Sequence, residues 1–256
     1  MDTTSADSSP RIAVVTGAGT GIGRAVALGL LGAGWCVALL GRRLAPLQDT
    51  ARRAPHADRT LCLPTDVSDA DAVAHAFTAI VAQWGRVDLL FNNAGTFAGG
   101  GPLQDVTAQT WREVMAVNLD GAFFCAQAAY AQMLRQSPPG GRIINNGSVS
   151  AQVPRPHAVA YSTSKHAING LSKSLALEGR AHGITCGQID IGNALTELTA
   201  DMPRGMLQPD GQRRPEATMG LQPVVDAVLY QAHLPPGVAV PFMTVMAAGM
   251  PLVGRG

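Results

Sequence analysis

The sequence predicts an α/β fold in which a doubly wound parallel sheet of about seven strands is flanked by helices on both faces. Two observations support this prediction. Short apolar runs rich in β-branched residues alternate with segments of helical hydrophobic period, as they do in repeated βαβ units. The first apolar run also ends in a glycine-rich loop that leads directly into a helical segment. Parallel strands joined in this way have right-handed crossovers, which restricts the topology further.

The elements follow from the positions of these runs. Strands are expected, in chain order, at residues 12–16, 35–40, 59–63, 87–91, 142–145, 184–189 and 240–245. Hydrophobic residues recur with a helical period over residues 21–32, 69–84, 107–136 and 161–182. The third of these segments is long enough for two consecutive helices. Gly183 follows the last helix at the position where a left-handed backbone conformation is common.

The chain is expected to form a single domain over residues 11–256. Its 256 residues are 46% hydrophobic, which is ample for a large buried core, and no linker divides them. Residues 1–10 lack both a basic start and an apolar run, so we predict a disordered tail rather than a signal peptide. Residues 25–41 carry no charge, but the run is shorter than the ~20 residues of a membrane span and is broken by Gly32 and Gly34.

Residues 192–220 are rich in Gly, Pro and Met and have weak periodicity. A long segment of this kind is usually functional, so we expect a lid over a binding site; the alternative is a partly disordered surface loop. If it is a lid, its apolar side chains would give an adaptable inner surface that favours aromatic or alkyl groups over charged ones. These side chains are Leu195, Leu198, Met202, Met206 and Leu207.

Composition excludes several classes of function. The formal net charge is +1 and the arginines are scattered or paired, so we expect no nucleic-acid partner. No membrane association and no metal site are expected, and we place the protein in the cytoplasm. The four cysteines lie far apart in apolar stretches and are expected to be reduced core residues: Cys36, Cys62, Cys125 and Cys186.

The glycine loop has the composition of a pyrophosphate-binding site. It reads Thr16-Gly17-Ala18-Gly19-Thr20-Gly21-Ile22-Gly23, a T-G-x-x-x-G-x-G spacing rather than the common G-x-G-x-x-G. Glycines let the backbone approach phosphates, and the free N–H groups at the start of the following helix point toward them. The sequence therefore predicts a dinucleotide site at the end of the first strand.

The end of the second strand indicates which dinucleotide. An acidic residue about 20 positions after the glycines would hold a ribose 2′-hydroxyl, but Gly41 stands there and Arg42 and Arg43 follow. A guanidinium can bind a 2′-phosphate, whereas a carboxylate would repel one. We therefore expect a preference for NADP(H) over NAD(H), unless both arginines are merely solvated surface charges.

Polar residues also follow the third and fourth strands. Asp66, before Val67, can accept a hydrogen bond from an adenine amino group or cap the next helix, although Ser68 is the better N-cap. Asn92-Asn93-Ala94-Gly95 lies at the carboxyl edge of the sheet, where ligands bind, but Asn and Gly also favour simple turns.

A tyrosine and a lysine provide the clearest chemical pattern. Tyr161 and Lys165 are four residues apart, which places them on one face of a helix. A phenol ionises near pH ~10, and a neighbouring ammonium should lower that pKa. Ser148 follows the fifth strand and is expected at the same edge of the sheet.

Taken together, these residues resemble the short-chain dehydrogenase/reductase family over nearly the whole chain. The resemblance implies a Rossmann-type fold and rests on five motifs in order: Thr16–Gly23, Asn92–Gly95, Asn118, Ser148 and the pair Tyr161 and Lys165. It implies that Tyr161 exchanges the proton with the substrate oxygen, Ser148 holds that oxygen, and Lys165 binds the nicotinamide ribose. Asn118, otherwise a helix break, would anchor a water that links Lys165 to solvent.

The chain departs from the family pattern in three places. The family's Pro-Gly after the sixth strand is Ile191-Gly192 here, which weakens the assignment of Thr196 to the nicotinamide amide. Thr20 stands where many NADPH-using relatives have Arg or Lys. The C-terminus lacks the glycine-rich ending common in relatives that act on acyl-carrier substrates or sugars, which leaves the subfamily open.

The leading interpretation is an NADPH-dependent carbonyl reductase with an apolar pocket and a small-molecule substrate. The alternatives are an NAD-dependent alcohol or diol dehydrogenase, an acyl-carrier-protein reductase with Arg155 as a docking residue, and a non-catalytic dinucleotide sensor. A sensor would be expected to lose the Tyr or the Lys. Apolar faces on the helices that contain Asn118 and Tyr161 lead us to expect a homodimer or homotetramer, as is usual in the family.

Overall fold

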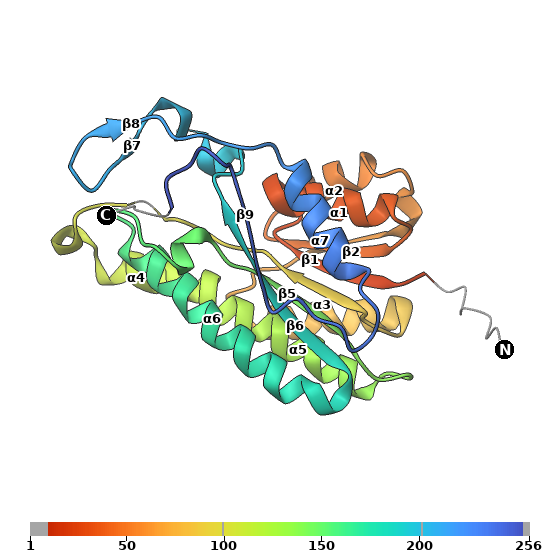
Figure 1. Cartoon of the computed structure of the whole chain (residues 1–256). Helices are drawn as coiled ribbons and strands as arrows, with labels where there is room; N and C mark the ends of the chain where they lie inside the picture. The colour runs from red at the N-terminus through yellow and green to blue at the C-terminus, as the bar shows by residue number, and fades with distance from the viewer. Residues whose placement is uncertain (1–9, 99, 201, 253–256) are drawn as a thin grey trace.

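A parallel sheet of seven strands runs through the described part of the molecule (Figure 1). The computed structural model describes residues 10–98, 100–200 and 202–252. The strand order is β3-β2-β1-β4-β5-β6-β9, and every neighbouring pair is parallel. The strands are β1 (Ile12–Thr16), β2 (Cys36–Gly41), β3 (Thr60–Pro64), β4 (Leu89–Asn92), β5 (Gly141–Asn146), β6 (Ile184–Gly192) and β9 (Phe242–Met246).

This order confirms the doubly wound fold that the sequence predicts. The chain moves outward from β1 to β3, returns to β4 beside β1, and then moves outward on the other side. In such sheets ligands bind beyond the carboxyl ends of the strands at the point where the order reverses. The expected strands are present with ends shifted by at most three residues, the largest shift being at the end of β6. For example, β4 begins at Leu89 because the N–H of Val87 donates to Gln136 Oε1 at 2.9 Å instead of to a strand.

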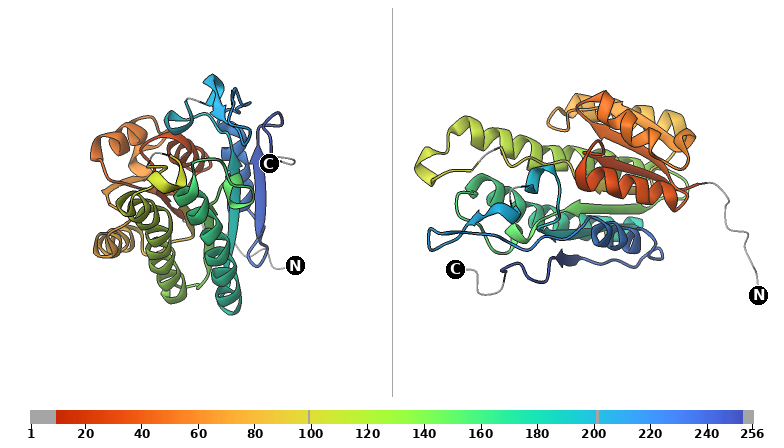
Figure 2. Two further views of the ribbon diagram at one scale, coloured as in Figure 1. Left: turned by 90° about the vertical axis from the view of Figure 1, so that its left-hand side faces the viewer. Right: turned by 90° about the horizontal axis from the view of Figure 1, so that it is seen from above.

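Helices cover both faces of the sheet, as Figure 2 shows. The helices α1 (Gly21–Gly32), α2 (Leu44–Arg52) and α7 (Gln222–Ala232) pack into one core with the side chains of alternate residues of β1. The helices α3 (Ala70–Trp84), α5 (Gly121–Arg135) and α6 (Val159–Gly179) form the second core on the other face. The short helix α4 (Ala108–Met115) packs against α6.

Several helices differ from their expected limits. The hydrophobic period does not indicate α2 and α7, which are short and have a proline in the first turn. Residues 107–136 form two helices as expected, but a π-helical turn, Ala116–Asp120, joins α4 to α5 without a break. The N-cap of α3 is Asp69, whose Oδ1 accepts from the N–H groups of Asp71 and Ala72, so the expected cap by Ser68 is wrong.

Other expectations concern single residues and the chain as a whole. Gly183 has φ +66° after α6 and a 3₁₀ turn, as expected. The four cysteines are free thiols; Cys62 is half-buried and the other three are buried. None of the helices in the described ranges is long and apolar enough to cross a membrane. Most of the expected tail, residues 1–9, lies outside the described residues.

Candidate active site

The glycine loop between β1 and α1 presents backbone rather than side chains at the carboxyl edge of the sheet. Gly17 and Gly21 have φ angles of +66° and +50°, which favour glycine. A Cβ at Gly23 would overlap the carbonyl oxygen of Gly17, so the first turn of α1 packs directly on the loop. No side chain caps the start of α1, where Thr20 is the N-cap residue. The first N–H groups of this helix therefore face the site without a side-chain partner, as an anion-binding helix start requires.

A groove of about 530 Å³ follows this loop and the ends of the neighbouring strands. The predicted coenzyme-binding residues that line it are Gly17, Gly19, Thr20, Arg42, Arg43, Asp66, Val67, Ala94 and Gly95. Thr16, Gly21, Ile22, Gly23 and Asn93 belong to the same loops without lining the groove. Four segments distant in sequence therefore meet where the sequence predicts a dinucleotide site.

Two arginines and an aspartate lie at one end of the groove. Arg42 and Arg43 follow β2, and both are exposed. Within the described ranges, neither guanidinium makes an ion pair. Asp66 accepts from the Ser68 N–H at 3.0 Å and from its hydroxyl at 2.7 Å, both through Oδ1. The hydrogen bond from the Ser68 hydroxyl, and to a smaller extent the charge of Arg42, lower the pKa of Asp66. The two arginines thus remain available to an anion in the groove.

Thr16 is buried and holds the loop after β4 in place. Its Oγ1 accepts from the backbone N–H groups of Asn93 and Ala94, each at 2.8 Å, and Asn93 Nδ2 donates to the Thr16 carbonyl at 2.9 Å. Asn146 Nδ2 in turn donates to Asn93 Oδ1 at 2.8 Å. The N-N-A-G segment is therefore more than a turn, because it ties the ends of β1, β4 and β5 together.

Tyr161, Lys165 and Ser148 meet at the carboxyl end of β5. Ser148 follows β5 and is buried, and its Oγ accepts from the Ser150 N–H at 3.1 Å. Lys165 is buried, its Nζ lies 5.7 Å from the centre of the Tyr161 ring, and it donates to the Asn146 carbonyl at 2.7 Å. Because β5 and α6 both present their residues at this edge, the three predicted side chains converge on one point.

The protonation of the pair differs from the sequence expectation. Burial raises the pKa of Tyr161, and a hydrogen bond from Ser148 and the charge of Arg155 only partly oppose this effect. Burial also lowers the pKa of Lys165 to about 8, while the charge of Asp190 raises it. The expected lowering of the phenol pKa by Lys165 is therefore not observed here: burial dominates the shift, and the Lys165 ammonium donates to the Asn146 carbonyl. The phenol is held in its neutral form.

Asn118 lies in the π-helical turn between α4 and α5. Its Oδ1 accepts from the Thr96 N–H at 2.8 Å, and its Nδ2 donates to the Thr96 carbonyl at 2.9 Å and to Ser164 Oγ at 3.1 Å. Ser164 directly precedes Lys165. The turn therefore places Asn118 between the segment after β4 and the helix that contains Tyr161 and Lys165, and π-helical turns of this kind are frequent at functional sites.

Gly192 and Thr196 lie beyond the end of β6. Gly192 is buried and packs against Met246 and Met250 so closely that a Cβ would clash with both. Ile191 replaces the proline of the family and packs into the core. The Thr196 side chain lies beside Gly21, and its Oγ1 is 3.1 Å from Thr199 Oγ1. Thr196 is thus at the glycine loop despite the lost proline.

The segment from Leu195 to Thr218 leaves the body and returns to its own starting point. Leu195 N–H donates to the Met219 carbonyl at 2.9 Å, and Met219 N–H donates to the Asn193 carbonyl at 3.0 Å. Between these bonds the chain forms two 3₁₀ turns and a hairpin of β7 (Met206–Leu207) and β8 (Arg213–Arg214), at the upper left of Figure 1. The segment expected to be a lid is therefore a loop whose two ends are hydrogen-bonded to each other and which contains 3₁₀ turns and a short hairpin. The side chain of Leu198 lies outside what the structure describes.

An ion pair that the sequence analysis did not identify fastens this loop. Both guanidinium NH groups of Arg155 donate to the carboxylate of Glu216, at 2.9 and 2.7 Å, and the two side chains are only 11% and 2% exposed. Asn193 Nδ2 and Gln208 Nε2 also donate to Glu216, at 2.8 and 3.1 Å. Together these bonds lower the pKa of Glu216 to about 2, although burial opposes them. We call the pair Arg155 and Glu216 the latch.

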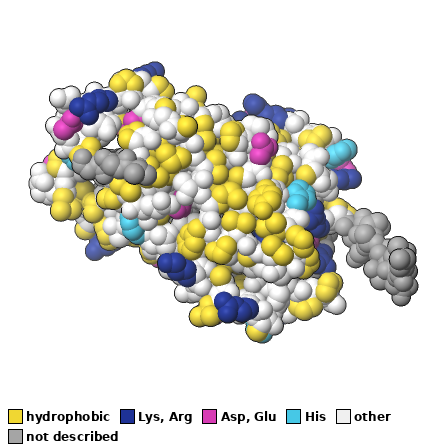
Figure 3. Space-filling view, in the orientation of Figure 1, with side chains coloured by type: hydrophobic (Ala, Val, Ile, Leu, Met, Phe, Trp, Pro, Cys, Tyr) yellow, Lys and Arg dark blue, Asp and Glu magenta, His cyan; other side chains and the backbone are white. Residues whose placement is uncertain are grey.

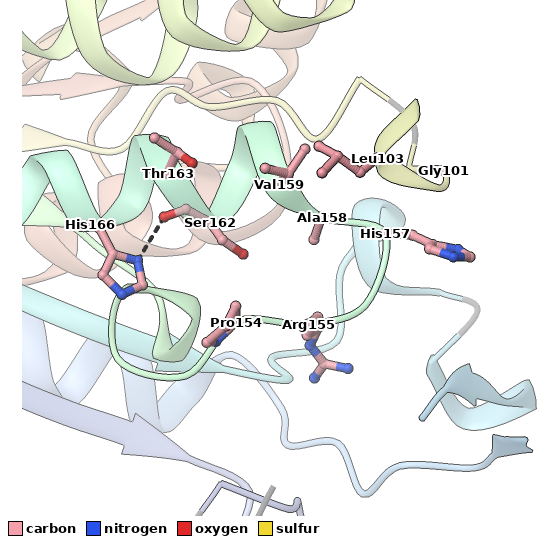
Figure 4. A pocket seen from close by; sticks show the side chains of 10 residues that line it. All are labelled: Gly101, Leu103, Pro154, Arg155, His157, Ala158, Val159, Ser162, Thr163 and His166. Atoms are coloured by element: carbon pink, nitrogen blue, oxygen red, sulfur yellow. Dashed lines mark hydrogen bonds between the residues drawn. The ribbon is translucent and has the colours of Figure 1, made fainter. Parts of the chain in front are cut away.

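A second pocket of about 410 Å³ lies beside the latch, next to the first turns of α6. Figure 4 shows Pro154 and Arg155 on one side of it and Ser162 and His166 on the helix. His166 Nδ1 is 2.8 Å from the Ser162 carbonyl. Tyr161 and Lys165 do not line this pocket, so it is separate from the catalytic edge of the sheet.

Comparison with known proteins gives consistent results. A family model described as short chain dehydrogenase matches residues 11–206. The 2-(R)-hydroxypropyl-CoM dehydrogenase of Xanthobacter autotrophicus is 38% identical over 193 residues, which cover 74% of this chain and 76% of that protein. The crystal structure of acetoin dehydrogenase YohF from Salmonella typhimurium has a TM-score of 0.80 at 30% identity, covering 97% of this chain and 99% of that one.

A more distant structure agrees in fold alone. The 3-ketoacyl-(acyl-carrier-protein) reductase from Brucella melitensis, complexed with NADH, has a TM-score of 0.79 at 22% identity. The two chains match over 93% of this one and 97% of that one.

Proposed function

The chain belongs to the short-chain dehydrogenase/reductase family of NAD(P)(H)-dependent oxidoreductases, and on this basis we propose that it is an NADP(H)-dependent carbonyl reductase that acts on neutral, apolar substrates. The convergence of Tyr161, Lys165 and Ser148 at the carboxyl end of β5 carries the proposal. The groove beside them supports a dinucleotide, since its glycine cradle leaves no room for a Cβ at Gly23 and the start of α1 has no side-chain cap.

The proposed reaction assigns one role to each of the catalytic residues. A bound nicotinamide coenzyme supplies the hydride in reduction and accepts it in oxidation. Ser148 donates a hydrogen bond to the substrate oxygen and fixes its position. Tyr161 donates its proton to the same oxygen in reduction, and takes it back in oxidation. The ordinary pKa of a phenol is ~10 and burial raises that of Tyr161, so the phenol carries the proton that reduction requires.

Lys165 and Asn118 serve the proton supply and the coenzyme. Lys165 is within hydrogen-bond distance of the Asn146 carbonyl, and we assign it to the nicotinamide ribose. We assign Asn118 to a water that connects Lys165 with solvent, because it donates to Ser164, the neighbour of Lys165. Thr196 would contact the nicotinamide amide from its position beside Gly21.

The latch supports a neutral substrate. The charge of Arg155 lowers the pKa of Tyr161, in opposition to burial. Its guanidinium is paired with Glu216 and buried, which leaves it unavailable to a substrate carboxylate. The same burial argues against Arg155 as a docking residue for an acyl carrier protein.

The second candidate is an NAD-dependent alcohol or diol dehydrogenase. It is supported by the names of the relatives, one of which is a dehydrogenase of a hydroxypropyl compound. The arginines at the groove favour NADP(H) instead. We also propose that the chain forms a homodimer or homotetramer, because Phe123 and Leu134 of α5 and Leu177 of α6 are exposed large hydrophobic residues.

A substrate panel with both coenzymes tests the proposal. Aldehydes, ketones, secondary alcohols and oxo acids are assayed with NADPH, NADH and their oxidised forms, in the parent and in Tyr161→Phe. We expect the highest kcat/KM for NADPH with an uncharged ketone or aldehyde, and no turnover in the variant, although it still binds coenzyme. Turnover of the variant near the parent rate contradicts the proposed mechanism. A clear preference for NAD⁺ with a diol would favour the second candidate.

A further inference from the structure

A buried carboxylate lies directly behind the proposed catalytic serine. Asp190 is on β6, next to the Ser148 loop at the end of β5, and is only 2% exposed. Burying an ionised carboxylate is costly unless several donors satisfy it. In the described part of the chain, no Lys, Arg or His forms an ion pair with Asp190. Hydrogen bonds to neighbouring groups must therefore offset the cost of burying the Asp190 carboxylate.

Hydrogen bonds connect Asp190 to the Ser148 loop at two points. Its Oδ1 accepts from the Ser148 backbone N–H at 3.1 Å, and its Oδ2 accepts from Gln152 Nε2 at 2.7 Å. Gln188 Nε2 also donates to Oδ1 at 2.7 Å. All three partners are N–H donors, so the carboxylate acts only as an acceptor. The loop from Ser148 to Gln152 is thus fastened to β6 at its beginning and its end.

Packing of the backbone restricts the same loop. A Cβ at Gly147 would overlap Oδ1 of Asp190, so the chain crosses the carboxylate in direct contact. The Gly147 N–H donates to the Ile189 carbonyl at 2.8 Å. The Ser148 hydroxyl accepts from the Ser150 N–H within the same turn. A change at Asp190 is therefore expected to move the Ser148 hydroxyl relative to Tyr161.

The carboxylate also acts on the catalytic pair electrostatically. Its charge raises the pKa of Lys165 against the effect of burial, and raises the pKa of Tyr161 further. The other charged group that affects Tyr161 is Arg155, which lowers its pKa. Asp190 thus opposes the loss of a proton from either member of the pair.

We propose that Asp190 is a positioning residue of the reaction: it fixes the loop that contains Ser148 through two hydrogen bonds, and thereby the position of the Ser148 hydroxyl. The inference rests on the proposed roles of Ser148, Tyr161 and Lys165. It adds a residue that has no place in the five motifs, and it assigns a function to the Asp that precedes the altered Ile191-Gly192 sequence.

The substitution Asp190→Asn tests the proposal. The amide has nearly the same shape, but it carries no charge and turns an N–H₂ group toward a neighbouring donor. We expect kcat to fall about 10- to 100-fold, as is typical when a supporting partner of an active site is lost. The Kd for coenzyme, measured by fluorescence titration, should stay within about threefold. A melting temperature and circular dichroism verify folding.

The pH profile of alcohol oxidation distinguishes the electrostatic effect from a structural one. In this direction activity rises as Tyr161 loses its proton. Because the carboxylate raises the pKa values of Tyr161 and Lys165, its removal should move the rising limb of kcat toward lower pH, by about half to one unit. A purely structural defect lowers kcat without moving the limb. A variant with kcat within twofold of the parent and an unmoved limb overturns the proposal.

Two further variants separate the hydrogen bond from the charge: Gln152→Met tests the bond, and Thr244→Val is its matched control. Gln152→Met removes the hydrogen bond to Oδ2 but keeps the charge, so kcat should fall at least threefold with an unmoved limb. Thr244→Val removes only the other contact of Gln152, at 3.0 Å, and should behave like the parent. If Asp190→Asn does not fold, equal kcat values for these two variants overturn the proposal. An active Tyr161→Phe would instead contradict the proposed function itself, so the two failures are distinguishable.

Discussion

At the scale of single residues, the coenzyme groove ends in two arginines whose position could be read from the sequence. Gly41 removes the carboxylate that would hold a ribose 2′-hydroxyl, and Arg42 and Arg43 line the groove. Both arginines are exposed, and the charge of Arg42 reaches Asp66 on the neighbouring strand end. A phosphate bound here would contact a guanidinium that has no competing ion pair in the described ranges.

We predict that Arg42→Ala removes most of the preference for NADPH over NADH. A charge-assisted hydrogen bond is worth ~1.5–3 kcal/mol, or roughly one to two powers of ten in affinity. Because the loop provides Thr20 rather than a basic residue, only Arg43 remains to contact a 2′-phosphate in this variant. The ratio of kcat/KM for the two coenzymes measures it in the parent, in Arg42→Ala and in Arg43→Ala as a matched control. A parent that prefers NADH, or an Arg42→Ala variant that keeps the NADPH preference, contradicts this prediction.

The residue scale also shows where local reasoning about protonation fails. The spacing of Tyr161 and Lys165 is a local property of a helix and was read correctly, since both side chains lie at the same edge. The pKa of the phenol depends on how much protein surrounds it, and burial changes it in the opposite direction from the neighbouring ammonium. Burial is decided by the packing of the whole domain, so the sequence did not provide it.

At the scale of elements, the segment between Asn193 and Met219 is closed at its base. Two backbone hydrogen bonds and the latch hold its ends together, and the hairpin of β7 and β8 extends from them. A loop whose ends are fixed to each other can move as a unit without disturbing the sheet. This arrangement is suited to a lid, and the function of the segment stays a prediction.

We predict that residues 193–215 become resistant to proteolysis when coenzyme and substrate are bound. Leu195 is 48% exposed and Met206 and Leu207 are half-buried, so this segment has apolar surface available to a ligand. Limited proteolysis followed by mass spectrometry should show slower cleavage in the segment with both ligands than without them. Cleavage sites elsewhere in the chain serve as the control. Equal rates within the segment in both states would show that it does not close over the ligand.

The latch makes the stability that this segment gives to the fold depend on pH. Because hydrogen bonds from Arg155, Asn193 and Gln208 lower the pKa of Glu216 to about 2, the ionised form stabilises the fold. That stabilisation is complete above the ordinary pKa of about 4.5 and is lost as the pH falls through about 2. Glu216→Gln should lower the free energy of unfolding by about 2–4 kcal/mol at pH 7, because Arg155 stays buried without its partner.

Urea unfolding at pH 7 and pH 3.5 measures this effect. The difference in the free energy of unfolding between the parent and Glu216→Gln should be smaller at pH 3.5 than at pH 7, by about 1 kcal/mol. The double variant Arg155→Met, Glu216→Gln removes both charges, so its free energy of unfolding should fall less than that of Glu216→Gln alone. A difference between parent and single variant that does not change with pH would show that the charge of Glu216 is not the source of the stability.

At the scale of the whole molecule, apolar side chains remain exposed on two surfaces. One consists of Phe123 and Leu134 on α5 and Leu177 on α6, and the other of Tyr230 on α7, Val238 and Phe242 on β9. Figure 3 shows hydrophobic side chains gathered over α7 and β9. Surfaces of this kind mark association sites in many proteins.

We predict that the chain is a homodimer or homotetramer in solution. Light scattering after size exclusion should give a mass two or four times that of the chain. Leu177→Asp, which is 66% exposed and should not disturb the core, is expected to reduce the mass. Leu103→Asp is the matched control, because Leu103 is 72% exposed and lies on neither surface. A parent of monomer mass would contradict the prediction.

The sequence by itself determined the strands of the sheet, the glycine loop, the two arginines, Ser148 and the pair Tyr161 and Lys165. Each of these depends on a hydrophobic period or on a short spacing, and both are local properties of the chain, whereas Asn118 follows from the resemblance to the family. It did not determine α2 and α7, which are short and have a proline in the first turn, or the π-helical turn at Asn118, where the helical period continues without interruption.

Only the tertiary structure decided the contacts that support these residues. Asp190 and the Ser148 N–H are 42 residues apart, and Arg155 and Glu216 are 61 apart, yet each pair forms a hydrogen bond. Asp190 meets the Ser148 N–H because β5 and β6 lie side by side in the sheet. Glu216 meets Arg155 because the segment after β6 returns to its own start. The physical reason is that a spacing along the chain fixes which side chains share a helix or strand face, whereas burial and long-range charge pairing depend on which elements the fold packs together.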